Sequence, residues 1–314
     1  MNTPLAIHPE LLSVKGRTLP LNRWALVPLQ MLLSGVNALH RRKFKDIALR
    51  TKIPSFDGYP VPVAIIRAEN LNTPAPALVY YHGGGFVLRP APQHFENAVR
   101  YAREARCVVI FTEYRLAPQY PFPAGFNDCY AALGWTLSNA EQLGIDKARI
   151  VVGGDSAGGC MAAGVAQRAL QEDGTPLCAQ LLIYPCVDLL CTRPSISAYA
   201  SVPPFKNAST VAIAEAYLGH AASQGMPRYA SPLRDDVSGV APAYVETSEF
   251  DLLHDQGIAY AQALIDKGVH VELNDIKGSI HGFDLMAAGS SVSGAAMQRR
   301  IEFLRHAFDN ARAG

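Results

Sequence analysis

The hydrophobic pattern of the chain alternates between strand-like and helix-like segments over most of its length. Continuous apolar runs such as Leu181-Leu182-Ile183 are typical of strands buried on both faces of a parallel sheet. This alternation predicts an α/β fold, with a mostly parallel sheet and helices on both of its faces. The expected strands cover 77–81, 107–112, 150–153, 179–184, 243–247 and 269–276, and the expected helices cover 94–105, 124–138, 157–171, 255–267 and 295–310.

Two further strand-like runs come before this alternation, at 46–54 and 59–67. They are joined at Asp57-Gly58, a dipeptide that favours a tight hairpin turn. With this hairpin added to the later runs, the pattern predicts a sheet of about eight strands.

Two segments break the alternation. Residues 1–45 have an amphipathic helical pattern that Pro20 and Pro28 interrupt, and residues 190–225 combine several prolines with a helix-like run. We expect these two segments to pack together as a helical cap. Residues 46–189 and 226–314 then form the main domain.

Length, composition and charge limit the classes of function. The 314 residues are 49% hydrophobic and carry a formal net charge of +1. Such a chain suits one large α/β domain and can bury a substantial core. The charge gives no sign of nucleic acid or an anionic membrane as a partner. The apolar stretch 24–39 is short and interrupted by proline and polar residues, so we expect no stable membrane association.

The cysteines and the first residues bear on the compartment. The six cysteines show no metal-binding spacing. Met1-Asn2-Thr3-Pro4 lacks the charged and apolar regions of a signal peptide. We therefore expect free, mostly buried thiols in a cytoplasmic protein.

The sequence Gly154-Asp155-Ser156-Ala157-Gly158 fits the pattern G-x-S-x-G and lies between an expected strand and an expected helix. In that setting the pattern is typical of a sharp turn that lifts a nucleophilic serine above the end of a strand. Side chains in place of the flanking glycines would collide across the bend. Ser156 is therefore the candidate nucleophile, and the positive end of the following helix favours a negative charge beside it.

A serine hydroxyl is a poor nucleophile at neutral pH and needs a base beside it. Among the nine histidines, His270 lies in an expected strand, His306 in the last expected helix, and His254 too close to the candidate acid. His281 lies in a glycine-rich loop after the last expected strand. Loops beyond the carboxyl ends of strands are where α/β sheets build their sites, so His281 is the predicted general base.

The acid that orients this histidine should follow the preceding strand. Asp251 is our choice, with Glu249 as the rival. Asp251 would hold the imidazole tautomer and stabilise the imidazolium. A purely structural alternative is that Asp251 caps the helix that begins near Asp255.

A glycine run after the first parallel strand can supply backbone N–H groups to a developing oxyanion. This run is His82-Gly83-Gly84-Gly85. The expected donors are Gly84, Gly85 and Ala157, with Gly83 as a further candidate. His82 is expected to brace the loop by hydrogen bonds, and the alternative is that the run forms only a tight turn.

The sequence lacks complete motifs for cofactor or metal binding. The glycine run lacks the continuation of a dinucleotide-binding loop, and neither glycine-rich turn has the Lys-Ser/Thr of a phosphate-binding loop. No H-E-x-x-H or similar metal spacing occurs. We therefore expect neither a cofactor nor a metal.

Five segments match a known pattern in the same order and span residues 80–283. Together they resemble the bacterial branch of the hormone-sensitive-lipase family of α/β-hydrolases. The segments are His82-Gly83-Gly84-Gly85-Phe86, Tyr114-Arg115-Leu116-Ala117-Pro118 with Tyr120-Pro121-Phe122-Pro123-Ala124, Gly154-Asp155-Ser156-Ala157-Gly158-Gly159, Glu249-Phe250-Asp251-Leu252-Leu253-His254-Asp255 and His281-Gly282-Phe283.

The resemblance implies an α/β-hydrolase fold and a cofactor-free carboxylesterase. It implies a triad of Ser156, Asp251 and His281, an oxyanion hole from the glycine run and Ala157, and a helical cap. Leu252 departs from the family, which usually has proline after the acid, and this could loosen the Asp251 loop slightly.

The expected activity is hydrolysis of short- to medium-chain acyl esters through an acyl-enzyme, on a small-molecule ester substrate. An amidase or arylesterase would use the same triad, since the triad does not choose the leaving group. A non-catalytic small-molecule receptor is the alternative from another class, and the presence of His281 argues against it. A homodimer is compatible with the sequence.

Apolar side chains in the two cap segments need a partner surface, and the catalytic edge of the sheet is the natural one. We expect them to roof the serine and limit the acyl pocket. They are Trp24, Leu26, Val27, Leu29, Met31, Leu32, Leu33, Tyr199, Val202, Phe205 and Tyr217.

Overall fold

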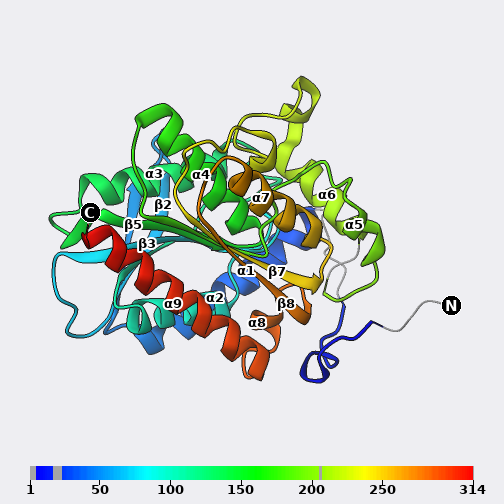
Figure 1. The fold of residues 1–314 in the computed structure, drawn as a ribbon, viewed down its shortest axis with the longest axis horizontal. Helices are drawn as coiled ribbons and strands as arrows, with labels where there is room; N and C mark the ends of the chain where they lie inside the picture. Colours follow the sequence, from blue (N-terminus) through cyan, green and yellow to red (C-terminus); the bar gives the residue numbers. More distant parts are fainter. Residues whose placement is uncertain (1–4, 17–22, 205–206, 314) are drawn as a thin grey trace.

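A computed structural model describes residues 5–16, 23–204 and 207–313. Within these residues, an eight-stranded sheet has the order β1-β2-β4-β3-β5-β6-β7-β8 (Figure 1). β2 is antiparallel to β1 and β4, and all other neighbouring pairs are parallel. The mostly parallel eight-stranded sheet predicted from the sequence is therefore confirmed. The strands are β1 (Ala48–Pro54), β2 (Pro60–Arg67), β3 (Ala75–Tyr81), β4 (Val108–Thr112), β5 (Ile145–Asp155), β6 (Ala179–Ile183), β7 (Ala243–Phe250) and β8 (Val271–Ile280).

Helices cover both faces of the sheet, as predicted. Figure 1 shows α3, α4 and α7 on one face and α2 and α9 on the other. The helices are α1 (Arg23–His40), α2 (Pro92–Glu104), α3 (Ala124–Ser138), α4 (Ala157–Asp173), α5 (Pro194–Ala198), α6 (Asn207–Leu218), α7 (His254–Asp266), α8 (Phe283–Met286) and α9 (Ser291–Ala313).

The sheet separates two apolar cores because successive side chains of a strand point to opposite faces. Val79 of β3 and Val152 of β5 belong to the core that includes α3, α4 and α7. Their neighbours Leu78 and Val151 belong to the core that includes α2 and α9. All four side chains are fully buried, which explains why the strand sequences are continuously apolar.

Three strands are longer than their sequence pattern predicted. β5 begins at Ile145 rather than 150, β7 ends at Phe250 rather than 247, and β8 ends at Ile280 rather than 276. These extensions contain polar residues and glycine, which carry no strand signal. Their consequence is that Asp251 and His281 directly follow strand ends.

Pro28 does not interrupt the first helix as expected, because it lies inside the continuous helix α1. The described part of α1 runs from Arg23 to His40, and at Pro28 the ring removes one hydrogen bond of the helix. Pro20 lies outside the described residues.

The candidate site lies where the strand order reverses. β3 has β4 on one side and β5 on the other, so the chain builds the sheet outward in both directions from this point. Ligands of open α/β sheets bind beyond the carboxyl ends of the strands at such a point. The glycine run follows β3 and Ser156 follows β5. None of the described helices is both long and apolar enough to cross a membrane.

Candidate active site

Ser156 lies at a strained turn between β5 and α4. Its backbone has φ 53° and ψ −116°, outside the regions that residues with side chains favour. The turn brings the backbone close to the end of β3. A Cβ at Gly158 would lie 1.9 Å from the Tyr81 carbonyl oxygen, and a Cβ at Gly154 would lie 2.4 Å from the same oxygen. Glycine is therefore required at both flanking positions, and the bend presents the Ser156 hydroxyl at the end of the sheet.

Three predicted site residues meet at this edge. His281 Nε2 is 3.0 Å from Ser156 Oγ, and His281 Nδ1 is 2.7 Å from Asp251 Oδ2. All three side chains are buried. Burial works to lower the pKa of His281, but the charge and hydrogen bond of Asp251 raise it above its usual value. The second oxygen of Asp251 accepts the Leu253 N–H at 2.9 Å, which fixes the carboxylate.

Glu249, the alternative candidate for the acid, contacts the loop that precedes His281. Glu249 Oε2 accepts the Gly278 N–H at 2.8 Å, and Lys277 lies 3.6 Å from its other oxygen. Its carboxylate therefore holds the backbone of the loop that leads to His281. Asp251 is not the N-cap of α7, because the residue at that position is Leu253.

The glycine run leaves two backbone donors available. Gly84 has φ +115° and Gly85 has φ +59°, conformations that strongly favour glycine. No described acceptor takes the N–H of Gly84, Gly85 or Ala157. The Gly83 N–H instead donates to Asp155 Oδ1 at 3.0 Å, so it is engaged elsewhere. Gly83 is thereby removed from the candidate donors.

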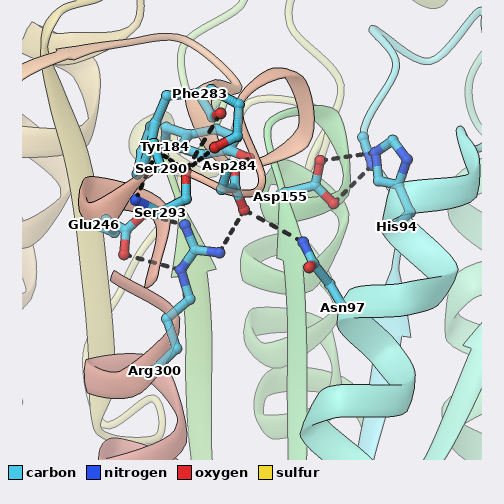
Figure 2. Close-up of polar contacts among 12 residues, drawn as sticks. His94, Asn97, Asp155, Tyr184, Glu246, Phe283, Asp284, Ser290, Ser293 and Arg300 are labelled. Carbon is cyan, nitrogen blue, oxygen red and sulfur yellow. Dashed lines mark hydrogen bonds and ion pairs between the residues drawn. The ribbon is translucent and has the colours of Figure 1, made fainter. Parts of the chain in front are cut away.

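Asp155 anchors this loop and was not predicted to do so. Tyr80 donates its hydroxyl proton to Asp155 Oδ1 at 2.7 Å, and His94 Nε2 lies 3.1 Å from Oδ2 (Figure 2). The Ala91 N–H donates to His94 Nδ1 at 2.9 Å, so in the neutral imidazole the proton is on Nε2, facing Asp155. Burial works to raise the pKa of Asp155, yet the contacts with His94 and Tyr80 lower it to about 2.

Aromatic packing holds the other side of the loop. The His82 ring stacks on Tyr114 with 4.5 Å between ring centroids, and the Tyr114 hydroxyl donates to the His82 carbonyl at 2.7 Å. Burial, and then the neighbouring His94, lower the pKa of His82 to about 3. The ring is therefore neutral, and it braces the loop by stacking as well as by hydrogen bonds.

A second buried network, which includes Tyr184, Asp284, Glu246 and Arg300 (Figure 2), contacts His281 through Tyr184. The Tyr184 ring lies edge-on to the His281 ring, 4.9 Å between centroids, and its hydroxyl donates to Asp284 Oδ1 at 2.5 Å. Arg300 of α9, fully buried, pairs with Asp284 and Glu246 at 2.5 Å each. Buried ion pairs of this kind fix geometry, because removing one partner leaves an unpaired charge inside the protein.

Two pockets meet at Ser156. A narrow one has about 40 Å³ of free space and apolar walls from Phe86, Leu189, Ile213 and Leu253. By the usual volume of about 10–15 Å³ per water, it holds roughly three waters. A larger one has about 770 Å³ and extends past Gly84, Asp155 and His281 toward the N-terminal segment.

The cap expectation holds for only some of its residues. Leu29 and Leu33 of α1 line the larger pocket. Tyr217 of α6 stacks on Phe86 with 3.9 Å between centroids, beside the narrow pocket. However, Trp24, Met31 and Leu32 do not roof the serine, because their side chains are 84%, 70% and 64% exposed. The helical pattern could not tell which face of α1 meets the body of the protein. Phe205 lies outside the described residues.

Sequence comparison identifies a protein family and related proteins. A sequence model of the α/β hydrolase fold family matches residues 78–285. Carboxylesterase NlhH of Mycobacterium tuberculosis is 35% identical over 266 residues, which cover 83% of each chain. An ethyl acetate hydrolase of Pseudomonas putida is 37% identical over 254 residues, which cover 80% of this chain and 78% of that one.

Solved structures of esterases are similar along nearly the whole chain. A bacterial heroin esterase superimposes with a TM-score of 0.85 and 32% identity, covering 96% of this chain and 98% of that one. Esterase LipW from Mycobacterium marinum superimposes with a TM-score of 0.87 and 30% identity, covering 96% of both chains.

Proposed function

Because the chain belongs to the α/β hydrolase fold family and its relatives are carboxylesterases, it is a carboxylic ester hydrolase, and we propose that it works through an acyl-enzyme on Ser156. The observation that carries the proposal is the aligned pair of contacts, 3.0 Å from Ser156 Oγ to His281 Nε2 and 2.7 Å from His281 Nδ1 to Asp251. This is the geometry of an activated nucleophile, its base and the group that orients the base.

Acylation begins when Ser156 Oγ attacks the ester carbonyl carbon and His281 Nε2 takes the hydroxyl proton. The carbonyl oxygen becomes an oxyanion, held by the N–H groups of Gly84, Gly85 and Ala157. The tetrahedral intermediate collapses, the bond to the alcohol oxygen breaks, and His281 returns the proton to that oxygen. The acyl group remains on Ser156.

Deacylation repeats these steps with water. His281 takes a proton from the water, whose oxygen attacks the acyl carbon, and the proton then returns to Ser156 Oγ as the acid leaves. In both halves Asp251 keeps the Nδ1 proton of His281 in place and stabilises the imidazolium that forms. Asp155 holds the Gly83 N–H and so keeps the glycine loop in position for both oxyanions.

We assign the narrow pocket to the acyl chain because its walls are apolar and its space is small. Each buried methylene gains about 0.8 kcal/mol until the pocket is full, and further carbons then clash. The cap in this proposal consists of residues 1–45 and 190–225, over a catalytic domain of 46–189 and 226–314, with α6 as the wall of the narrow pocket.

The test of the proposal is a series of p-nitrophenyl esters from acetate to palmitate. We expect kcat/KM to rise or hold up to butyrate or hexanoate and then to fall steeply. Ile213→Ala, which removes a wall of the narrow pocket, should move the optimum to longer chains. Leu33→Ala, in the larger pocket, is the matched control whose acyl optimum should stay. A preference of the intact enzyme for long chains, with activation at a lipid interface, would contradict the proposal.

The oxyanion donors are tested by Gly84→Val. The added Cβ would meet the Leu88 carbonyl oxygen at 3.0 Å, and a β-branched residue is strained at φ +115°. Loss of one donor costs about 3 kcal/mol of transition-state stabilisation, so kcat should fall by about two orders of magnitude. Gly174→Val is the control for backbone strain, because Gly174 also has positive φ but no heavy atom within 4 Å of an added Cβ. Wild-type kcat in soluble Gly84→Val protein would rule out this placement.

A further inference from the structure

The walls of the larger pocket carry an unbalanced positive charge. Its charged lining side chains are Lys15, Arg89 and Asp155. Arg89 is partly buried, and Lys15 lies on the N-terminal segment that contributes to the lining. Among the described residues, neither cation makes an ion pair with a carboxylate. Their charges are therefore available to a ligand.

The carboxylate in this lining offsets only one of these two positive charges, and its oxygens are already engaged within the protein. Asp155 is 2% exposed, and its two oxygens accept from Tyr80, the Gly83 N–H and His94. Figure 2 shows the contact with His94. A carboxylate with its hydrogen-bond positions filled by donors in the protein interior has little to offer a substrate cation. The side chains that face the open space of the pocket thus favour an anion.

The residues outside the described ranges do not supply the missing negative charge. They are residues 1–4, 17–22, 205–206 and 314, and none of them is Asp or Glu.

The two pockets differ in the chemistry that they can hold. The narrow pocket has apolar walls around Ser156, and the larger one is wide, partly polar and cationic. An ester divided between them would place its hydrocarbon acyl chain in the first and a polar alcohol part in the second. The lining of the larger pocket includes Arg89, and a guanidinium binds carboxylates through two parallel hydrogen bonds.

We propose that the enzyme prefers esters whose alcohol part carries a carboxylate, that is, short-chain acyl esters of hydroxy acids, and that Arg89 with Lys15 binds this carboxylate. This inference rests on the proposed function and deepens it by naming the substrate class. Recognition of this kind changes the affinity for the charged ester over its neutral analogue, so the readout is a ratio between matched substrates.

The experiment compares two ester pairs that differ only in charge. γ-Acetoxybutyrate and γ-acetoxybutyramide place the charge on the alcohol part. Ethyl hydrogen succinate and ethyl succinamate place it on the acyl part. For each pair we take the ratio of kcat/KM for the anion to that for the amide, at neutral to mildly alkaline pH. We expect a ratio of about five to ten for the alcohol-side pair and a ratio at or below one for the acyl-side pair.

The variants assign this ratio to named side chains. Arg89→Gln should lower the alcohol-side ratio about fivefold, and Lys15→Gln should lower it by a smaller factor because Lys15 is exposed to solvent. Arg103→Gln, an exposed guanidinium on α2 outside the pocket, is the matched control and should leave the ratio as it is. Added salt should lower the wild-type ratio, since ions screen the attraction.

Each outcome decides one point. An alcohol-side ratio at or below one, or a charge preference found only on the acyl side, overturns the inference while hydrolysis of the amide esters upholds the proposed function. A high ratio that neither Arg89→Gln nor Lys15→Gln lowers overturns the assignment of the binding residues. If the enzyme hydrolyses none of the four esters and no p-nitrophenyl ester, the proposed function fails and this inference fails with it.

Discussion

Replacing Ser156 with alanine is expected to lower kcat by a factor on the order of 10⁴–10⁶ while the protein stays folded. In the proposed mechanism, the change removes the oxygen that attacks the ester and carries the acyl group. It keeps the Cβ, so the strained backbone at φ 53° meets no new collision. The measurement is kcat with p-nitrophenyl acetate, together with the thermal unfolding midpoint as the test of folding.

A covalent label gives the matched control for this variant. Diethyl p-nitrophenyl phosphate should add one diethylphosphoryl group to the wild-type protein and none to Ser156→Ala, as read by intact mass. Ser13→Ala changes an exposed serine of the larger pocket and should still be labelled. A folded Ser156→Ala protein that retained a tenth of the activity would show that another residue is the nucleophile.

The Asp251→Asn variant should lose about 10⁴-fold in kcat. The asparagine amide can donate to His281 Nδ1, which leaves the ring proton on Nε2, facing Ser156. In that tautomer His281 cannot take the serine proton, and the imidazolium also loses its stabilising charge. The measurement is kcat at a pH where the wild-type rate has reached its plateau.

Glu249→Gln is the control for Asp251→Asn, because it removes a carboxylate two residues away on the same strand end. The glutamine oxygen can still accept the Gly278 N–H that Glu249 holds at 2.8 Å. We expect a change in kcat of only a few-fold, since the contacts of Glu249 are with the Gly278 N–H and Lys277. If Glu249→Gln were far more damaging than Asp251→Asn, the acid would be Glu249.

The parts of the site that local sequence determines were predictable. The glycines around Ser156 are required by close backbone approaches at one tight turn, where Gly154 meets Gly158 and both meet the Tyr81 carbonyl oxygen at the end of β3. The pattern G-x-S-x-G between a strand and a helix locates that turn directly. Asp251 and His281 could be selected because loops after strands meet at one edge of a parallel sheet. The exact ends of β7 and β8 could not be predicted, because the last residues of both strands include polar residues that resemble a loop.

The residues that support the site were missed for a physical reason. His94 contacts Asp155 across 61 positions of the chain, and Arg300 contacts Glu246 across 54. Such pairs are created by tertiary packing, and no periodicity within one segment indicates them. Asp155 lay inside the motif, but nothing there showed that its carboxylate would hold the glycine loop. Similarly, the amphipathic pattern of α1 identified a helix without showing that Trp24 would stay exposed.

The placement of α6 has a consequence for how substrate preference could diverge among descendants of this protein. The groups that we propose to break and form bonds are attached to strand ends and to the glycine loop. Thr210, Ile213 and Ala214 of α6 instead line the narrow pocket from a segment between β6 and β7. Substitutions in that segment can change which acyl chains fit while the reacting atoms keep their spacing. Acyl-chain preference can therefore change during evolution while the catalytic geometry is kept. A new preference then does not require an inactive intermediate.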